Sequence, residues 1–132
     1  MPFYQLLCIS THYSEFKFIR TLVKTSAMHI FNSGGVVRDI KFMGTRILPS
    51  KMKRHTKAQT IGDYWTIDFD SNPKVMQELE ARLRQDPTVL RWTTLKLGSR
   101  LMECVEKPVQ TEQATFKELK EFRQAIADRS FL

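Results

Sequence analysis

The chain has 132 residues, of which 42% are hydrophobic and 11% aromatic, and its 21 Lys and Arg against 14 Asp and Glu give a net charge of +7. This composition fits one folded domain with room for an appendage, and it excludes a disordered basic tail. No apolar run is long enough to span a bilayer. Residues 3–9 form an apolar segment directly after Met1-Pro2, so we expect no cleavable targeting peptide.

The cysteines and histidines indicate neither a disulfide framework nor a metal site. The two cysteines, Cys8 and Cys104, are far apart, and the three histidines are scattered without a ligand spacing. Cys8 lies in an apolar segment and is expected to be a small buried hydrophobe. We therefore expect no metal and no cofactor.

The first half of the chain predicts a strand, a helix and a second strand. Residues 3–10 are apolar on both faces, as in a central strand. Apolar residues then recur at helical spacing from Phe16 to Phe31, and Gly34-Gly35 is expected to end that helix. Residues 36–43 predict a strand whose interspersed charges favour a sheet edge. Gly44 allows a bend, and Pro49 is expected to stop pairing because proline lacks the amide donor.

The second half repeats a strand, a helix and a strand. Residues 61–69 predict the third strand, with Trp65 on its core face and Tyr64 on the other face. Asn72-Pro73 is expected to start a helix, because Asn caps free amides and proline fits the first turn. Asp86-Pro87 ends that helix. Residues 89–97 predict the fourth strand.

These elements occur in the order strand-helix-strand-strand-helix-strand. Two helices packed on one face of a four-stranded antiparallel sheet satisfy this order with right-handed crossovers. The sequence therefore predicts an α+β fold of the ferredoxin-like βαββαβ type, with the spatial strand order 4-1-3-2. The first and third strands would be central, in agreement with their apolar character. We assign this fold to a domain of residues 1–97.

Residues 98–132 predict a linker followed by a C-terminal helical extension. Gly98 and Pro108 are typical of the linker, and Thr115 with Glu118 forms a capping box. The expected helix presents one apolar face, made of Phe116, Leu119, Phe122 and Ile126. The segment holds six basic and six acidic residues, so phosphate is not its expected target. It either folds back onto the domain or lies along a partner protein.

Positive charge is concentrated in one short stretch. Residues 46–57 hold five basic residues and no acidic residue, between two predicted strands, and are expected to form a hairpin loop. Clustered positive charge attracts phosphate and releases its counterions. The stretch therefore predicts nucleic-acid binding through Lys51, Lys53, Arg54 and Lys57. The alternative is a solvated loop that serves solubility.

Four segments resemble the bacterial-type small-subunit ribosomal protein six family. Leu83–Arg91 resembles the family's Leu-Arg, Asp and Val-Leu-Arg where its second helix meets its last strand. Gly44–Leu48 matches Gly-x-Arg-x-Leu at the end of the second strand, and Gly62–Trp65 resembles the Gly-x-Tyr that opens the third. Phe3–Gln5 lies where the family begins with an aromatic strand. The resemblance covers roughly residues 3–97, with the same order of elements.

The resemblance implies a structural protein of the small ribosomal subunit and not an enzyme. It would lie in the platform of the subunit and bind small-subunit rRNA beside ribosomal protein eighteen. Pro49-Ser50 replaces the family's Ala-Tyr, and the extension after Leu97 is not part of the core pattern. These departures favour a member from the mitochondrial ribosome in the matrix, with the bacterial cytoplasm as the alternative. The extension would contact other small-subunit proteins.

Two arginines in the matching motifs are further candidates for RNA contacts. The guanidinium of Arg46 can hold phosphate oxygens in a fork, and the alternative is a strand-end arginine in water. Arg91 is expected to meet RNA or a partner, or to form an ion pair with Asp86.

The candidates for a protein interface are Ile47, Leu48, Tyr64 and Trp92. The two aromatic residues are expected on the open sheet face or near an edge, where a neighbouring protein would cover them.

Two other functions share this order of elements. An RNA-recognition-motif domain would stack bases on exposed aromatics of its first and third strands, but Ile61–Ile67 lacks the leading basic residue of that motif and carries Asp63. A phosphatase on this fold needs a glycine-rich phosphate loop with an arginine after the first strand, and residues 10–14 contain neither. RNA recognition on single strands remains the alternative function.

Overall fold

The computed structural model describes residues 1–55, 57–100 and 102–103. Their elements follow the predicted order: β1 (Phe3–Thr11), α1 (Phe16–Asn32), β2 (Val36–Arg54), β3 (Lys57–Asp70), α2 (Pro73–Gln85) and β4 (Val89–Gly98). The predicted C-terminal helix, which the capping box at Thr115 and Glu118 was expected to start, lies outside the described residues. None of the described helices is long and apolar enough to cross a membrane.

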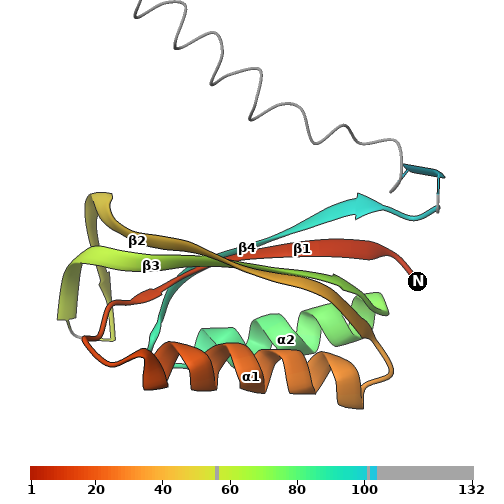
Figure 1. Ribbon diagram of the computed structural model, residues 1–132, viewed down its shortest axis with the longest axis horizontal. Helices are drawn as coiled ribbons and strands as arrows, with labels where there is room; N and C mark the ends of the chain where they lie inside the picture. Colours follow the sequence, from red (N-terminus) through yellow and green to blue (C-terminus); the bar gives the residue numbers. More distant parts are fainter. Residues whose placement is uncertain (56, 101, 104–132) are drawn as a thin grey trace, which may run out of the picture.

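The four strands form one antiparallel sheet in the order β2-β3-β1-β4, and both helices cover the same face of it (Figure 1). The predicted α+β, ferredoxin-like arrangement and strand order are confirmed. β1 and β3 are central, whereas β2 and β4 are the edges. We call the face without helices the open face.

The core lies between the sheet and the helices. Along β1, buried and partly exposed residues alternate, because successive side chains of a strand point to opposite faces. Trp65 is 1% exposed, as predicted for a core residue. Cys8 is fully buried, and burial raises the pKa of its thiol far above the ordinary value, which makes it unreactive.

Different residues determine the end of α1 and the start of α2. Gly34 has φ = 82°, a left-handed conformation that glycine adopts at low cost, and it follows the end of α1 as predicted. α2 begins at Pro73 after Asn72, also as predicted. The Asn72 side chain, however, makes no capping hydrogen bond, so the predicted cap is wrong. Its backbone carbonyl accepts a bond from the N–H of Met76.

The predicted basic hairpin loop is wrong in its secondary structure. β2 continues to Arg54 and β3 begins at Lys57, so most of the stretch forms a two-stranded ribbon. Pro49 does not end the strand. The pairing register shifts between Ile47 and Met52, and this bulge accommodates a residue without an amide donor. Regular pairing then resumes, so the cations are held in register on a ribbon.

Candidate nucleic-acid interface

The strand register assigns each basic side chain of the ribbon to a face. Residues paired directly across two antiparallel strands share a face. Arg46 pairs with Gly62, and Lys53 pairs with Ala58. Gly62 and Ala58 lie an even number of positions before Tyr64 on β3, so both pairs lie on the open face with Tyr64. Lys51 is exposed two positions before Lys53, at the end of the register shift between Ile47 and Met52.

The open face therefore carries a group of exposed cations, which we call the cationic face: Arg46, Lys51, Lys53 and Arg91. Ile9 of β1 pairs with Tyr64 on one side and Arg91 on the other, which places these three residues in one row. The Arg46 guanidinium lies 5.8 Å from the centre of the Tyr64 ring. Within the described part of the chain, none of the four cations forms an ion pair with a carboxylate. All four charges are available to an external anion.

The other end of the open face is electrically different. Arg38 makes two hydrogen bonds to the carboxylate of Asp70 and stacks on Phe3, with 4.2 Å between its guanidinium and the ring centre. The amine of Lys41 lies 3.5 Å from the carboxylate of Asp39. Cations at this end are compensated by neighbouring carboxylates, so they offer little attraction to phosphate.

Arg54 does not belong to the cationic face, contrary to the sequence prediction. It lies on the helix side of the ribbon, with its guanidinium 4.7 Å from the centre of the Trp92 ring. Its Nη2 donates to the backbone carbonyl of Arg84, in the last turn of α2, where carbonyls lack partners within the helix. A guanidinium stacked on an aromatic ring stabilises the fold. Arg54 therefore fastens the ribbon to α2 and β4.

Two of the predicted interface residues are less accessible than expected, although Trp92 lies on the edge strand β4, which was one of its two expected positions. Trp92 pairs with Cys8, so it faces the helices and not the open face, and it packs on the core beneath Arg54. Leu48 is only 6% exposed. A side-chain carbon on Gly62 would lie 3.2 Å from Leu48 Cδ2, so the absence of one at Gly62 leaves space for this leucine. Neither residue offers much surface to a partner.

The remaining candidates are accessible. Tyr64 lies on the open face, as predicted, and is partly exposed. Ile47 is 81% exposed and pairs with Ile61, which is 42% exposed. Lys57 and His55 are exposed at the tip of the ribbon, where His55 has φ = 51°.

Arg91 makes no ion pair with Asp86, so that alternative is wrong for the described residues. The carboxylate of Asp86 instead accepts hydrogen bonds from the N–H and the hydroxyl of Thr88, at 2.8 and 2.6 Å. These bonds shape the turn before β4. The Arg91 side chain remains exposed on the cationic face.

A polar cluster that sequence reasoning missed joins three segments near the base of the ribbon. The carboxylate of Asp63 is buried, accepts a hydrogen bond from the Thr45 hydroxyl and lies 2.9 Å from Nδ1 of His12. The three residues are distant in sequence, and Thr45 and Asp63 occupy unspecified positions of their motifs, so only the tertiary structure reveals the cluster. The cluster satisfies a buried charge and fixes the start of the ribbon against the loop after β1.

Comparison with protein families gives one match to most of the chain. Residues 3–96 match the family described as "Ribosomal protein S6". Among solved structures, the crystal structure of 30S ribosomal protein S6 from Thermotoga maritima superposes with a TM-score of 0.64 at 23% identity, covering 94% of this chain and 96% of that one. At this identity the superposition supports the fold alone.

Curated relatives come from both organelles and bacteria, judged by their names. "Small ribosomal subunit protein bS6m" of Neurospora crassa is 32% identical over 89 residues, which are 67% of this chain and 76% of that protein. The bS6m protein of Bos taurus is 29% identical over 106 residues, or 79% of this chain and 85% of that protein. The bS6 protein of Gluconobacter oxydans is 30% identical over 97 residues, which are 74% of this chain and 58% of that protein.

Proposed function

The chain belongs to the ribosomal protein S6 family, and we propose that it binds the RNA of the small ribosomal subunit through its cationic face. Members of this family are structural proteins of the small subunit, and this chain is one of them. The proposal adds the surface: Arg46, Lys51, Lys53 and Arg91 contact phosphate, with Lys57 at the ribbon tip.

The observation that carries this proposal is the contrast between the two ends of the open face. Arg38 and Lys41 are compensated by Asp70 and Asp39, whereas no described carboxylate pairs with the cations at the ribbon end. Uncompensated cations release the most counterions from RNA. Strand pairing also sets the spacing of the paired cations Arg46 and Lys53, which suits recognition of backbone shape in folded rRNA.

The aromatic residues of the open face do not support base stacking of the RNA-recognition-motif type. Such stacking needs free aromatic surfaces on the central strands. Here the described open face offers Phe3 on β1 and Tyr64 on β3, and arginines Arg38 and Arg46 already lie over their rings. The family match favours the structural role as well.

For the protein neighbour, we propose that Ile47 and Ile61 form the contact with ribosomal protein eighteen, with Tyr64 close by on the other face of β3. An isoleucine that is 81% exposed on an edge strand, opposite a second exposed isoleucine, gains from being covered. We prefer this pair to Leu48, which is buried, and to Trp92, which is partly buried against the core.

We further propose a mitochondrial location. Relatives named bS6m occur in Neurospora crassa, Drosophila melanogaster and Bos taurus, at 32%, 28% and 29% identity. The bacterial alternative rests on relatives such as those of Gluconobacter oxydans and Rickettsia bellii. Gradient sedimentation of separate cell fractions tests the location: the tagged chain should move with the small subunit of the mitochondrial fraction.

The RNA proposal is tested by neutralising the cationic face. Binding to small-subunit rRNA is measured over a range of KCl concentrations for the variant R46Q/K51Q/K53Q/R91Q. Each lost phosphate contact should reduce the slope of log K against log salt by about one unit. A control variant with the same net charge, K74Q/R84Q/K96Q/R100Q, changes exposed cations elsewhere and should keep most of the slope. Equal losses in the two variants would contradict the assignment.

A further inference from the structure

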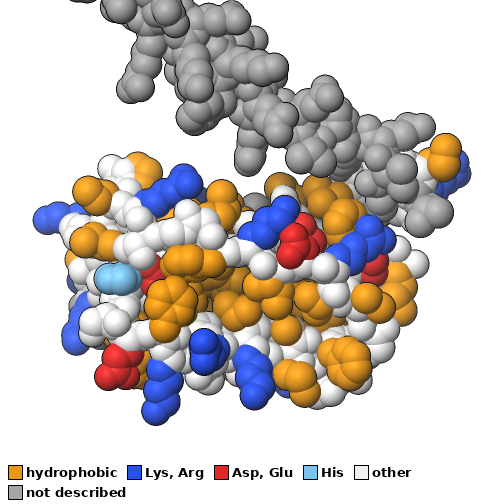
Figure 2. Space-filling view, viewed as in Figure 1, with side chains coloured by type: hydrophobic (Ala, Val, Ile, Leu, Met, Phe, Trp, Pro, Cys, Tyr) orange, Lys and Arg blue, Asp and Glu red, His pale blue; other side chains and the backbone are white. Residues whose placement is uncertain are grey.

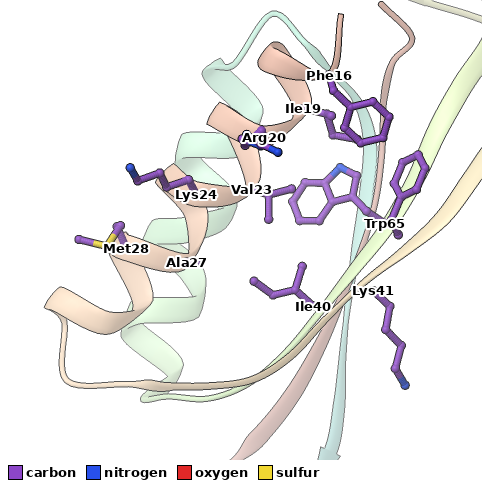
Figure 3. Close-up of a pocket in the computed structure, with 11 residues that line it drawn as sticks. Phe16, Ile19, Arg20, Val23, Lys24, Ala27, Met28, Ile40, Lys41 and Trp65 are labelled. Atoms are coloured by element: carbon purple, nitrogen blue, oxygen red, sulfur yellow. The ribbon is translucent and has the colours of Figure 1, made fainter.

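A hollow apolar surface lies on the other side of the sheet, between α1 and β2. Figure 2 shows it as a hydrophobic band between the two elements, with Lys and Arg side chains along its α1 border. The groove has a volume of about 480 Å³. Its walls include Phe16 and Met28 from α1 and Ile40 and Phe42 from β2, and Trp65 lies at its floor (Figure 3).

The groove walls expose far more apolar surface than single scattered residues would. Phe16 is 63% exposed, Met28 and Phe42 are each 47% exposed, and Ile40 is 45% exposed. The Phe16 and Phe42 rings touch edge to face, at 5.4 Å between centres, and so bridge α1 and β2. Contiguous exposed apolar surface of this kind typically marks an interaction site. These residues do not serve the core, since each leaves about half of its side chain in water.

A buried donor at the floor of the groove lacks an acceptor. The indole Nε1 of Trp65 has no hydrogen-bond partner among the described residues, although the side chain is 1% exposed. Figure 3 shows this nitrogen directed toward the end of the groove where Phe16 lies. A buried N–H without an acceptor costs stability. An occupant that displaces the exposed Phe16 ring and offers an oxygen would satisfy it.

The positive charge along α1 favours an occupant with negative charge. Lys17, Arg20 and Lys24 lie at helical spacing on one stripe, and α1 contains no acidic residue. Arg20 and Lys24 border the groove. Neither forms an ion pair with a described carboxylate. An occupant that carries Asp or Glu beside its apolar side chains would compensate these charges.

The backbone of β2 favours a helix over an added strand. The pairing register shifts between Val37 and Asp39 and again between Phe42 and Gly44, so the edge is regular over a few residues only. The N–H of Ile40 is already bonded to the carboxylate of Asp39, at 2.8 Å. Bulges and engaged amides protect an edge from strand addition. A helix with apolar residues at three- and four-residue steps needs no backbone pairing and fits a groove of this type.

RNA is a poor occupant because the walls are apolar. Of the three cations in the lining, Arg20, Lys24 and Lys41, the last lies 3.5 Å from the carboxylate of Asp39. The groove also lies on the helix side, since Phe42 pairs with Trp65, whereas the cationic face lies on the open side. Between the groove and Ile47 stands the polar cluster of Thr45, Asp63 and His12. The three surfaces are therefore separate, and their occupants need not compete.

We propose that the groove between α1 and β2 binds an acidic amphipathic helix of another protein of the small subunit. Its apolar ridge fills the space over Trp65, and its carboxylates face Lys17, Arg20 and Lys24. The surface is a third one, beyond those assigned to RNA and to ribosomal protein eighteen. The RNA proposal can fail without affecting it.

A photo-cross-linking experiment in the assembled particle identifies the occupant. Photoreactive benzoylphenylalanine replaces Phe42 in the full-length chain, small subunits are purified, and the cross-linked peptide is sequenced by mass spectrometry. The expected product is an amphipathic, acid-rich segment of another subunit protein. Replacement of Phe31, which is 68% exposed on α1 and lies outside the groove, should not give that product. A cross-link to rRNA, to residues 104–132 of this chain, to a second copy or to a basic segment would overturn the proposal.

A binding experiment with defined peptides tests the charge requirement in the isolated chain. The probe is a designed helical peptide with a leucine ridge flanked by Glu, and its counterpart carries Lys instead. The Glu peptide should bind at least tenfold more tightly, and R20E/K24E should reverse the preference. F42S should weaken binding at least tenfold, whereas F31S should not. Because Phe42 is half exposed, F42S should keep the urea midpoint of the parent chain, and equal affinity for both peptides would refute the charge argument.

Discussion

The two faces of the β2–β3 ribbon carry the same type of residue and use it differently. On the open side, Lys51 and Lys53 reach solvent without a carboxylate partner among the described residues. On the helix side, Arg54 lies on Trp92 and bonds the end of α2. Lys53 and Arg54 are adjacent in the chain, but successive side chains of a strand point to opposite faces, so the two residues have different roles. The number of cations in a stretch therefore overestimates its binding surface.

The largest expected effect concerns two neighbouring residues at the base of the ribbon. Leu48 is buried against Gly62, so L48A should lower the free energy of unfolding by about 3 kcal/mol, as for other buried leucines. Ile47 is exposed, and I47A should change stability by less than about 0.5 kcal/mol. Urea unfolding measures both. Equal destabilisation by L48A and I47A would contradict the burial of Leu48 and the exposure of Ile47.

The next effect tests the inward-facing cation. R54A removes the contact with Trp92 and the bond to Arg84, and should lower the free energy of unfolding by about 1 to 2 kcal/mol. Its effect on the salt slope of rRNA binding should be smaller than that of K53A, which in turn should leave stability unchanged. Urea unfolding and filter binding on the same two variants provide the test. A larger loss of salt slope for R54A than for K53A would assign Arg54 to RNA after all.

A smaller effect is expected when one positive charge is moved from β2 to β3. K53A should reduce the salt slope of rRNA binding by about one unit. Ala58 lies directly opposite Lys53, so K53A/A58K should restore the slope. Gln59 has the opposite parity, and K53A/Q59K should not restore it. Equal rescue by both variants would mean that net charge alone matters and that the face of the ribbon does not.

The smallest effect is the pH dependence of stability caused by a histidine outside the ribbon. His29 on α1 has a side chain that is 9% exposed, and burial followed by the charge of Arg82 lowers its pKa, against a weaker opposing effect of Glu78. The unfolded chain binds a proton near the ordinary pKa of 6.5 that the folded chain resists. The free energy of unfolding should therefore decrease as the pH falls below this value.

The variant H29Q should show a flatter dependence of stability on pH in the same range. RNA affinity should not follow this titration, because the cationic face consists of Lys and Arg, which stay charged. Urea unfolding and filter binding at a series of pH values compare the two. If H29Q retained the full decrease in stability at low pH, another group would be responsible.

The order of elements and the core could be predicted because they follow from local patterns. Helical spacing located α1, and the apolar character of β1 and β3 placed them at the centre of the sheet. Trp65 was assigned to the core from strand alternation alone. The extent of β2 was not predictable in this way, because Pro49 was treated as a stop. Whether a proline ends a strand depends on a bulge in the pairing, and that involves a second strand.

The candidate site was predicted in composition and only partly in geometry. The stretch of five cations was correctly identified as the main concentration of charge. The sides of the ribbon on which these cations lie follow from the pairing of β2 with β3, and a loop would have no such pairing. Arg91 was expected from its motif, and its row with Ile9 and Tyr64 appeared only through strand pairing. The burial of Leu48 was not expected, because it depends on the missing side chain of Gly62, a residue distant in sequence.

The succession of strands and helices, the apolar side of each, and the excess of positive charge follow from the sequence, since all three depend on residue type and on spacing over a few positions. The fold was needed to establish which charges remain uncompensated, which aromatic rings are covered, and where α1 leaves the sheet open beside β2. Those properties depend on contacts between residues far apart in the chain. The spacing of residues along one segment does not encode such contacts.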